Sequence, residues 1–509
     1  MILIASAKYL PIEFQIELGK LPPTFLPIGN KRLYEYQVKL FSSLNEKIIL
    51  SLPQSFIIEQ ADGDRLNQLN VDIIFVPDGI TLGESIIYCL NMLMPLGESI
   101  RILHGDTYFN NLKFQSNALA VSQAESSYDW EFLSTDYKSN NNLIYNDNTI
   151  LCGYFEIDKP YNFIQSVLKS NFSYIDGLKL YSKGNPFTIV EYHNWIDLGS
   201  VASYFHFKKS ITTQRAFNDL KIENGYFIKS SDMPLKIEGE INWFKNFPST
   251  LDLKLPRFIG LNSNSYKTEY LYLSTLSELF VFGKLPNFVW KKIFNNLRIF
   301  LNQLHSYQSD KESKFDFLTK TTDRLQNFIS DKDFDIKSIW KFEDIEISLD
   351  KMLKDINLVI RPNSSNSFIH GDFCFSNIMY DFKSEDIKTF DPRGVDFDGN
   401  ITPFGDARYD YAKLFHSCIG LYDFIIAGFY ECDIVDNKIN FYIKAPNSID
   451  LIQNEFLQML CNADIKELYA ITIHLFLSML PLHSDNKNRQ MALFANAFRL
   501  YKDFLNLRS

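Results

Sequence analysis

The first 110 residues alternate short apolar runs with longer segments whose apolar residues recur at helical spacing. The apolar runs are Ile2–Ser6, Lys47–Leu52, Val71–Val76 and Ile100–His104. The helical spacing is found between them, in Leu33–Ser43 and Leu82–Met94. Strands that alternate with helices pair in parallel, because each helix carries the chain back to the same end of the sheet. The pattern therefore predicts an α/β layer with a mainly parallel sheet, and ligands beyond the carboxyl ends of its strands.

The alternation continues to about residue 210 and then changes. Before that point, the sequence predicts strands at Trp130–Ser134, Ile150–Phe155 and Thr188–Tyr192, and a helix over Tyr161–Lys169. After it, we expect a strand at 226–229, a short helix at 238–247, a helical stretch over 269–330 interrupted near 283–286, a hairpin within 368–391, and helices in most of the remainder. The 509 residues suffice for two or three domains. We predict two, residues 1–210 and residues 215–509.

Composition excludes several classes of protein. Hydrophobic residues make up 46% of the chain and charged residues 22%, which is typical of a core-forming protein. The net charge of −10 argues against nucleic acid or an anionic membrane as a partner. The six cysteines show no CxxC spacing, so neither a zinc site nor a disulfide framework is expected. The longest apolar stretch, Tyr469–Leu482, is too short to span a bilayer. We expect a cytoplasmic protein without membrane insertion, and the oligomeric state stays open.

The strongest motif lies in the second half of the chain. It runs from His370-Gly-Asp372 to Asn377 and continues, after two apolar runs, at Asp391-Pro-Arg-Gly394. A carboxylate, an amide five residues later and a second carboxylate after a hairpin form the pattern that phosphoryl transfer needs. One carboxylate accepts the proton of the attacking hydroxyl, while the amide and the second carboxylate hold Mg²⁺ against the nucleotide phosphates.

The spacing can be tested geometrically. If Ile378–Tyr380 and Ile387–Phe390 pair antiparallel around a polar turn, Asn377 lies directly opposite Asp391. Opposed residues have Cβ atoms roughly 5 Å apart, so one divalent ion would fit between them. The alternative interpretation is a plain hairpin with solvated polar ends. A plain hairpin would explain any one of these residues alone, but it does not explain why all the residues of the motif occur together.

These motifs resemble the aminoglycoside phosphotransferase and choline kinase superfamily over roughly residues 215–509. The resemblance implies a two-lobed, protein-kinase-like fold, with ATP as phosphoryl donor and Mg²⁺ as cofactor. It also implies Asp372 as catalytic base, His370 as support of the catalytic loop, and Asn377 and Asp391 as magnesium ligands.

The resemblance extends to segments on either side of the motif. Upstream, Lys229 resembles the phosphate-binding lysine and Glu240 its helix partner, with Lys236 as the rival lysine. A Lys–Glu pair would fix the ammonium where it meets the phosphate charge. Downstream, the segment Gly405–Lys413 is expected to brace the catalytic loop.

Two aspartates in the first half follow predicted strands. The strand Arg101–His104 leads into Gly105-Asp106, and Trp195-Ile-Asp197-Leu-Gly199 comes much later. Two carboxylates at strand ends can share Mg²⁺, which would neutralise an incoming triphosphate and stabilise a pyrophosphate leaving group. The alternative for Asp106 is an ordinary turn residue after a buried strand.

With Leu26–Gln37 and Asp78–Ser85, these two motifs resemble the sugar-phosphate nucleotidyltransferase family over about residues 1–210. The resemblance implies a Rossmann-like fold, Asp106 and Asp197 as metal ligands, and CTP or UTP as the nucleotide. The chain departs from the family pattern after the first strand, where residues 5–11 contain no glycine. Pro23 stands where the family has a catalytic lysine, and the candidates to replace that lysine are Lys8, Lys20 and Lys31.

Three interpretations of the whole chain remain. In the first, a C-terminal kinase phosphorylates a small polar alcohol or sugar, and the N-terminal half transfers a nucleotide to the product. The resemblances place such a pair in the synthesis of bacterial surface-polysaccharide or lipooligosaccharide precursors. In the second, the N-terminal half is a non-catalytic nucleotide- or sugar-binding module attached to the kinase. In the third, the chain is a non-catalytic scaffold, against which the complete Asp372, Asn377 and Asp391 set argues.

Overall fold

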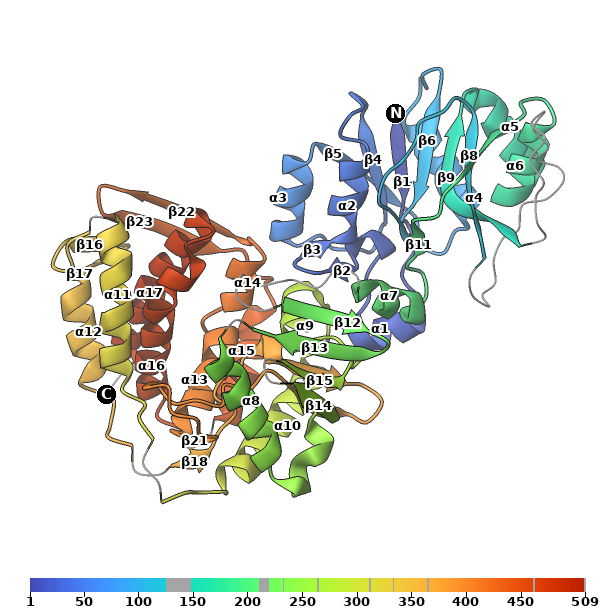
Figure 1. Cartoon of the computed structure of the whole chain (residues 1–509). Coiled ribbons are helices and arrows are strands. Elements are labelled where there is room, and N and C mark those ends of the chain that lie inside the picture. The colour runs from blue at the N-terminus through green and yellow to red at the C-terminus, as the bar shows by residue number, and fades with distance from the viewer. Residues whose placement is uncertain are drawn as a thin grey trace. The chain divides into compact units, whose positions relative to one another are not determined.

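The computed structural model describes residues 1–124, 148–209, 219–231, 233–262, 265–310, 313–332, 334–363, 366–460 and 463–507. The chain forms two compact units, Met1–Ile211 and Thr212–Ser509 (Figure 1). The predicted strand Trp130–Ser134 lies outside the described residues. Each unit is described by itself below.

The first unit is built on a seven-stranded sheet in the order β10-β8-β9-β6-β1-β4-β5. Its strands are β1 (Ile2–Ala5), β4 (Ile48–Pro53), β5 (Val71–Val76), β6 (Ile100–His104), β8 (Ala118–Gln123), β9 (Thr149–Ile157) and β10 (Thr188–Glu191). Every neighbouring pair is parallel except the two that involve β9. The predicted mainly parallel sheet is confirmed.

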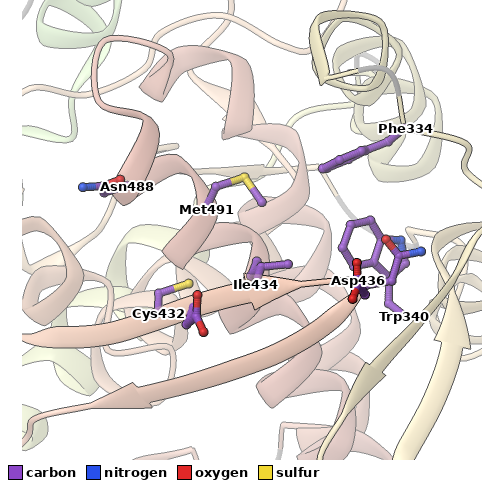
Figure 2. Close-up of a pocket in the computed structure, with 9 residues that line it drawn as sticks. Phe334, Trp340, Cys432, Ile434, Asp436, Asn488 and Met491 are labelled. Carbon is purple, nitrogen blue, oxygen red and sulfur yellow. The ribbon is translucent and has the colours of Figure 1, made fainter.

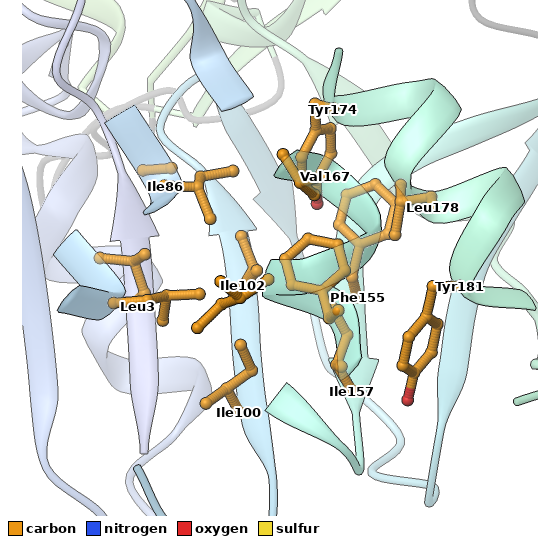
Figure 3. Close-up of a cluster of buried hydrophobic side chains, with 14 of the residues drawn as sticks. Leu3, Ile86, Ile100, Ile102, Phe155, Ile157, Val167, Tyr174, Leu178 and Tyr181 are labelled. Carbon is orange, nitrogen blue, oxygen red and sulfur yellow. The ribbon is translucent and has the colours of Figure 1, made fainter. Parts of the chain in front are cut away.

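Helices and short strands complete this unit. The helices are α1 (Ile12–Leu18), α2 (Leu33–Leu40), α3 (Gln60–Gln68), α4 (Leu82–Met92), α5 (Pro160–Lys169), α6 (Tyr174–Ser182) and α7 (Val201–Lys208). The short strands are β2 (Pro27–Ile28), β3 (Lys31–Arg32), β7 (Thr107–Phe109) and β11 (Trp195–Asp197). In the core, Ile102 and Phe155 of the sheet pack with Ile86, Val167 and Leu178 from α4, α5 and α6 (Figure 3). The alternating pattern of the sequence reflects this single apolar interface between sheet and helices.

The second unit begins with a small antiparallel sheet in the order β12-β13-β15-β14. Its elements are β12 (Asp219–Glu223), β13 (Tyr226–Ser230), α8 (Pro234–Asn246), β14 (Phe258–Asn262) and β15 (Ser265–Glu269). Helix α8 buries Ile237 and Ile241 against Tyr266 of β15. Asn224 and Gly225 both have positive φ angles, as a two-residue hairpin turn between β12 and β13 requires.

The remainder of this unit is mostly helical. Its helices are α9 (Leu276–Phe282), α10 (Asn287–His305), α11 (Phe317–Lys332), α12 (Leu349–Asn357), α13 (Arg408–Cys418), α14 (Tyr422–Ile426), α15 (Ile449–Met459), α16 (Ile465–Ser478) and α17 (Lys487–Asn506). Nearly all side chains of α16 from Leu468 to Ser478 are buried, which makes this helix the centre of the larger lobe. The predicted fold class, α/β followed by a two-lobed kinase-like unit, is confirmed.

The larger lobe also contains strands, several of which the sequence did not indicate. They are β16 (Ile339–Phe342), β17 (Ile345–Ser348), β18 (Ser367–Phe368), β19 (Ile378–Asp381), β20 (Asp386–Thr389), β21 (Phe404–Gly405), β22 (Tyr430–Val435) and β23 (Lys438–Ile443). The prediction of helices throughout the remainder missed the sheet β17-β16-β23-β22. Of the helices in the part of the chain described here, none is long and apolar enough to cross a membrane.

We propose that the two units fold independently, because each buries its own core. Fragments 1–210 and 215–509, expressed separately, should both be soluble, and their circular-dichroism spectra should add up to that of the whole chain. Insolubility of both fragments, or a summed spectrum with markedly less helix, would contradict this proposal.

Candidate functional site

The hairpin formed by β19 and β20 pairs in a register one residue away from the prediction. Asp381 lies opposite Asp386, which places Asn377 opposite Phe390 rather than Asp391. The predicted direct opposition of Asn377 and Asp391 was therefore wrong. The turn is the cause, because the Asp381 carboxylate accepts hydrogen bonds from two turn amides and closes a four-residue loop. Asp391 itself follows the strand with a φ of 59°.

Asp372 is held from two sides. The Asn377 Nδ2 donates to the Asp372 Oδ2 at 2.9 Å and to its main-chain oxygen at 2.9 Å. The Lys413 Nζ of α13 lies 2.8 Å from the other carboxylate oxygen. Although burial opposes the charge on Lys413, the Asp372 carboxylate raises the pKa of that lysine. The Asp372 side chain remains 31% exposed, so a substrate hydroxyl can reach it.

The loop that carries Asp372 is fixed by Asp410 of α13. The Asp410 carboxylate accepts hydrogen bonds from the amides of His370 and Gly371, at 2.9 and 2.8 Å. His370 is buried, and burial lowers its pKa, so the ring is neutral. Its Nε2 donates to the Phe390 carbonyl at 3.1 Å, while its Nδ1 accepts from the Asp372 amide at 3.3 Å. His370 thus links the loop of Asp372 to the end of the strand before Asp391. Because Asp410 holds the amides of that loop, the bracing role predicted for Gly405–Lys413 is confirmed.

Lys229 lies between two carboxylates. Its Nζ donates to the two Glu240 oxygens at 2.7 and 2.8 Å and also to Asp391 Oδ1. Lys229 and Glu240 are almost completely buried, and the Tyr266 hydroxyl donates to Glu240 at 2.8 Å. Burial and the negative charge of Asp391 raise the pKa of Glu240 to about 7. The cluster therefore contains two carboxylates for one ammonium. Of the two lysines that the sequence offered, Lys229 rather than Lys236 forms the pair with Glu240.

Backbone contacts fix α8 against the catalytic loop. The Trp243 indole N–H donates to the Ile369 carbonyl at 2.7 Å. A Cβ atom on Gly394 would lie 2.1 Å from the Gly239 carbonyl oxygen, so glycine is required there for the two backbones to approach. This contact places Glu240, the next residue of α8, beside the Asp391 segment.

The donor set fits a divalent cation with oxygen ligands. The Asp391 carboxylate is 33% exposed, so a cation can reach it. The Asn377 Nδ2 donates a hydrogen bond to Asp372, so the amide oxygen of Asn377 can serve as a second ligand. No group of three or more His, Cys, Asp or Glu side chains placed to bind a metal ion is found within the described ranges.

In the first unit, Asp106 follows β6 and Asp197 ends β11. β11 pairs with β7, so that Asp197 lies opposite Thr107. Asp197 Oδ1 accepts from the Gly199 amide at 2.7 Å. A Cβ atom on Gly199 would lie 3.0 Å from Asp197 Oδ1 and 3.1 Å from Asp106 Oδ2, so the two carboxylates approach one common point. The structure thus brings these two predicted residues together.

Within the described residues, no cationic side chain forms an ion pair with either carboxylate. Burial and the nearby Asp106 carboxylate raise the pKa of Asp197 to about 6. Gln37 of α2 supports the arrangement, because its Nε2 donates toward the carbonyl oxygens of His104, Gly105 and Thr107 at 2.9–3.1 Å. Sequence reasoning missed Gln37, whose only signal was its buried position on the first predicted helix. A cation shared by the carboxylates would offset their repulsion.

The three candidate replacement lysines lie in different surroundings. Lys20 places its Nζ 4.1 Å from the centre of the Tyr9 ring, and the Nζ of Lys31 lies 6.0 Å from that of Tyr36. Lys8 is exposed in the loop after β1. Helix α1, which the sequence did not indicate, comes directly after residues 5–11, the segment in which the family has its glycine-rich loop.

A cavity of about 410 Å³ lies elsewhere in the second unit. Its lining includes Trp340 of β16, Cys432 and Ile434 of β22 and Met491 of α17 (Figure 2). None of the residues that line it belongs to the candidate catalytic set. The candidate site is therefore defined by its side chains and not by this cavity.

Comparison with solved structures finds two classes of protein. A nucleoside-diphosphate-sugar pyrophosphorylase from Vibrio cholerae RC9 is 17% identical, with a TM-score of 0.33, and covers 41% of this chain and 99% of its own. A CTP:phosphocholine cytidylyltransferase from Streptococcus pneumoniae is 16% identical, with a TM-score of 0.33, and covers 42% and 98%. The GDP complex of an aminoglycoside 2'-phosphotransferase-IIIa is 13% identical, with a TM-score of 0.37, and covers 57% and 91%. At these identities the likeness concerns the fold alone.

Comparison with protein-family models and with curated proteins returns no match. The function of the chain is therefore inferred from the side chains of its candidate sites.

The Asp106–Asp197 pair generates a prediction about pH and metal. Because the pKa of Asp197 rises from 3.8 to about 6 on folding, this carboxyl destabilises the folded protein as the pH rises through that window. Asp197→Asn removes this destabilisation, which amounts to about 1–3 kcal/mol at pH 7.5. It should therefore raise the melting temperature by a few degrees at pH 7.5 and leave it nearly unchanged at pH 4.5. Mg²⁺ should stabilise the wild-type protein at pH 7.5 but not this variant.

The matched control is Asp72→Asn, which removes a carboxylate that is 57% exposed on β5. It should leave the Mg²⁺ response intact. A lower melting temperature for Asp197→Asn at pH 7.5, or an undiminished Mg²⁺ response, would overturn the assignment. Differential scanning fluorimetry with and without a chelator provides the measurement.

Proposed function

We propose that the second unit is a kinase that transfers the γ-phosphoryl group of ATP to a hydroxyl of a small polar molecule. The observation that carries this proposal is the Asp372 carboxylate, oriented by Asn377 and Lys413 and still accessible. The Lys229–Glu240–Asp391 cluster supports it, because it combines a fixed ammonium with an accessible carboxylate. Those are the two elements that a nucleotide triphosphate with its metal needs.

In this reaction Asp372 accepts the proton of the acceptor hydroxyl as its oxygen forms a bond to the γ-phosphorus. The bond between the γ-phosphorus and the β,γ-bridging oxygen breaks, and ADP leaves with that electron pair. Lys229 holds the α- and β-phosphates. When bound, Mg²⁺ would neutralise the phosphate charge, with Asp391 and the amide oxygen of Asn377 as its protein ligands. His370 touches no reacting atom and acts as a positioning residue.

We propose that the first unit transfers a nucleotide from CTP or UTP to the phosphorylated product, with release of pyrophosphate. The convergence of Asp106 and Asp197 supports this assignment, because two carboxylates that approach one point can share a metal ion. Mg²⁺ would be held by these two carboxylates. A bifunctional, cytoplasmic enzyme of surface-polysaccharide precursor synthesis would combine the two steps.

A specific observation favours a second candidate for the first unit. Residues 5–11, where a glycine-rich phosphate loop would be expected, contain no glycine and lead into helix α1, and Pro23 lies in a short 3₁₀ helix, Pro23–Phe25. Neither element offers the catalytic lysine of a nucleotidyltransferase. In this alternative the unit binds a nucleotide or sugar without catalysis.

The kinase assignment predicts that Asp372→Asn lowers ATP-dependent phosphorylation by about 10²–10⁴-fold, because the proton acceptor is lost while size is kept. Binding of a non-hydrolysable ATP analogue should persist. The assay combines ATP, Mg²⁺ and a panel of alcohols and sugars, with products identified by mass. Asp350→Asn, on the exposed side of α12, is the control. Normal turnover by Asp372→Asn would eliminate the assignment.

The transferase assignment predicts that Asp106→Ala and Asp197→Ala abolish pyrophosphate release while the kinase step continues, because the two sites have separate metals. Pyrophosphate release is measured with CTP or UTP and the product of the kinase step. Release that persists in both variants would refute the metal assignment. If the wild-type protein binds a nucleotide but releases no pyrophosphate, the binding-module alternative holds.

A further inference from the structure

Four cationic side chains gather around two aromatic rings next to Asp372. We call this group the cationic cluster; its members are Lys320 and Arg324 of α11, Arg393 of the loop after Asp391, and Lys413 of α13. The rings are those of Phe397 and Tyr409, whose centres are 5.3 Å apart.

The rings hold the cations together. The Lys320 Nζ lies 3.5 Å from the centre of the Phe397 ring and 5.4 Å from that of Tyr409. The Arg393 guanidinium shares the Phe397 ring at 5.2 Å, and the Lys413 ammonium shares the Tyr409 ring at 5.7 Å. Cation–π contacts of this kind position a charge without neutralising it.

The positive charge of the cluster is largely unbalanced. Lys413 pairs with Asp372, but within the described ranges no carboxylate lies within 4.0 Å of the other three cations. Their polar contacts are with neutral groups: Lys320 with the Tyr409 hydroxyl at 3.4 Å, Arg324 with the Ser478 carbonyl at 3.3 Å, and Arg393 with the Val395 carbonyl at 2.9 Å. All four side chains are only partly buried.

Such an arrangement is costly without a counter-ion. Burial, together with the charges of Arg393, Arg324 and Lys413, lowers the pKa of Lys320 well below its usual range. Burial and Arg393 also lower the pKa of Arg324. Clustered cations in proteins are normally paired or bound to an anion. By contrast, Arg408, the first residue of α13, forms ion pairs with Asp406 and Glu467.

The position of the cluster separates it from the nucleotide side of the site. The charges that act on Lys320 are those of its cluster neighbours and of Asp372. Those that act on Asp391 are Lys229, Lys236 and again Asp372. Lys413 of the cluster contacts Asp372 Oδ1, whereas Asn377, a proposed metal ligand, contacts Asp372 Oδ2, so the two groups meet different oxygens of this carboxylate. An anion bound by the cluster would lie on the acceptor side of Asp372.

We propose that the cationic cluster binds a carboxylate or phosphate group of the phosphate acceptor, so that the substrate is an anionic alcohol or sugar. This inference rests on the kinase function proposed above for Asp372. The anion takes the place of the missing counter-ion, and it fixes the acceptor with its hydroxyl at the Asp372 carboxylate. The γ-phosphate of the nucleotide is the other source of a similar anion, and the first experiment distinguishes the two.

The first experiment measures binding of inorganic sulfate to the full-length protein by isothermal titration calorimetry. Sulfate should bind equally well with and without a saturating non-hydrolysable ATP analogue. Lys320→Met keeps the packing on Phe397 but removes the charge, and it should weaken sulfate about tenfold or more. Arg324→Gln should act in the same direction. Lys354→Gln, on the exposed face of α12, is the matched control and should change nothing.

Three outcomes would overturn the proposal. Absence of sulfate binding to the wild-type protein would show that the cluster is no anion site. Sulfate affinity unchanged in both Lys320→Met and Arg324→Gln would place any anion elsewhere. Competition between sulfate and the ATP analogue would assign the cluster to the nucleotide. Melting temperatures show whether the variants are folded. Lys320→Met should not have a lower melting temperature than the wild-type protein, because it removes the repulsion between Lys320 and the other cations of the cluster.

The second experiment compares acceptors that differ only in an anionic group. Glycerol is paired with glycerate and ribitol with ribonate, and kcat/KM for ATP-dependent phosphorylation is measured for each. The anionic member of a pair should be preferred at least tenfold by the wild-type protein, and the preference should vanish in Lys320→Met. Equal use of both members would contradict the acceptor assignment. If no acceptor is phosphorylated while sulfate still binds through Lys320, the kinase proposal fails and the anion site stands.

Discussion

The architecture of the second unit depends on one buried ammonium. Lys229 comes from the small sheet, Glu240 from α8 and Asp391 from the end of the catalytic hairpin, and the lysine contacts both carboxylates. Removal of the Lys229 charge would leave the buried Glu240 carboxylate without its partner, and an unpaired buried charge is among the most costly changes in a protein interior. The contact therefore sets the position of the small sheet relative to the catalytic loop.

The candidate sites share a principle, since each brings like charges close together. Asp106 and Asp197 repel one another, and Asp391 raises the pKa of Glu240 in the cluster around Lys229. On the far side of Asp372 the sign is reversed, because cations rest on aromatic rings instead of on acids. A polar bond network involving His370 and Asp410 keeps the intervening loop in place. Asp372 thus contacts Lys413 of the cationic cluster with one carboxylate oxygen and Asn377 with the other.

Much of this could be predicted from the sequence, and the failures have physical causes. The α/β layer was predictable because strands and helices that pack against one another carry apolar residues at periodic positions. The register of the hairpin was not, because it depends on the side-chain hydrogen bonds of Asp381 in the turn. Helix α1 carries only two buried residues, Phe14 and Leu18, so its pattern is weak. Lys413 was visible only as a member of the bracing segment, since its partner Asp372 lies far away in the chain.

The contact between Gly239 and Gly394 restricts how this unit can be recombined. A side chain on Gly394 would collide with the carbonyl group of Gly239, so any larger residue must push helix and loop apart. That separation would draw Glu240 away from Asp391 and break the bridge that Lys229 makes between them. A chimera that took its small lobe from one protein and the segment from Asp372 to Gly394 from another would inherit only half of this fit. The lobes are interchangeable only where both glycines, and the backbone around them, are exchanged together.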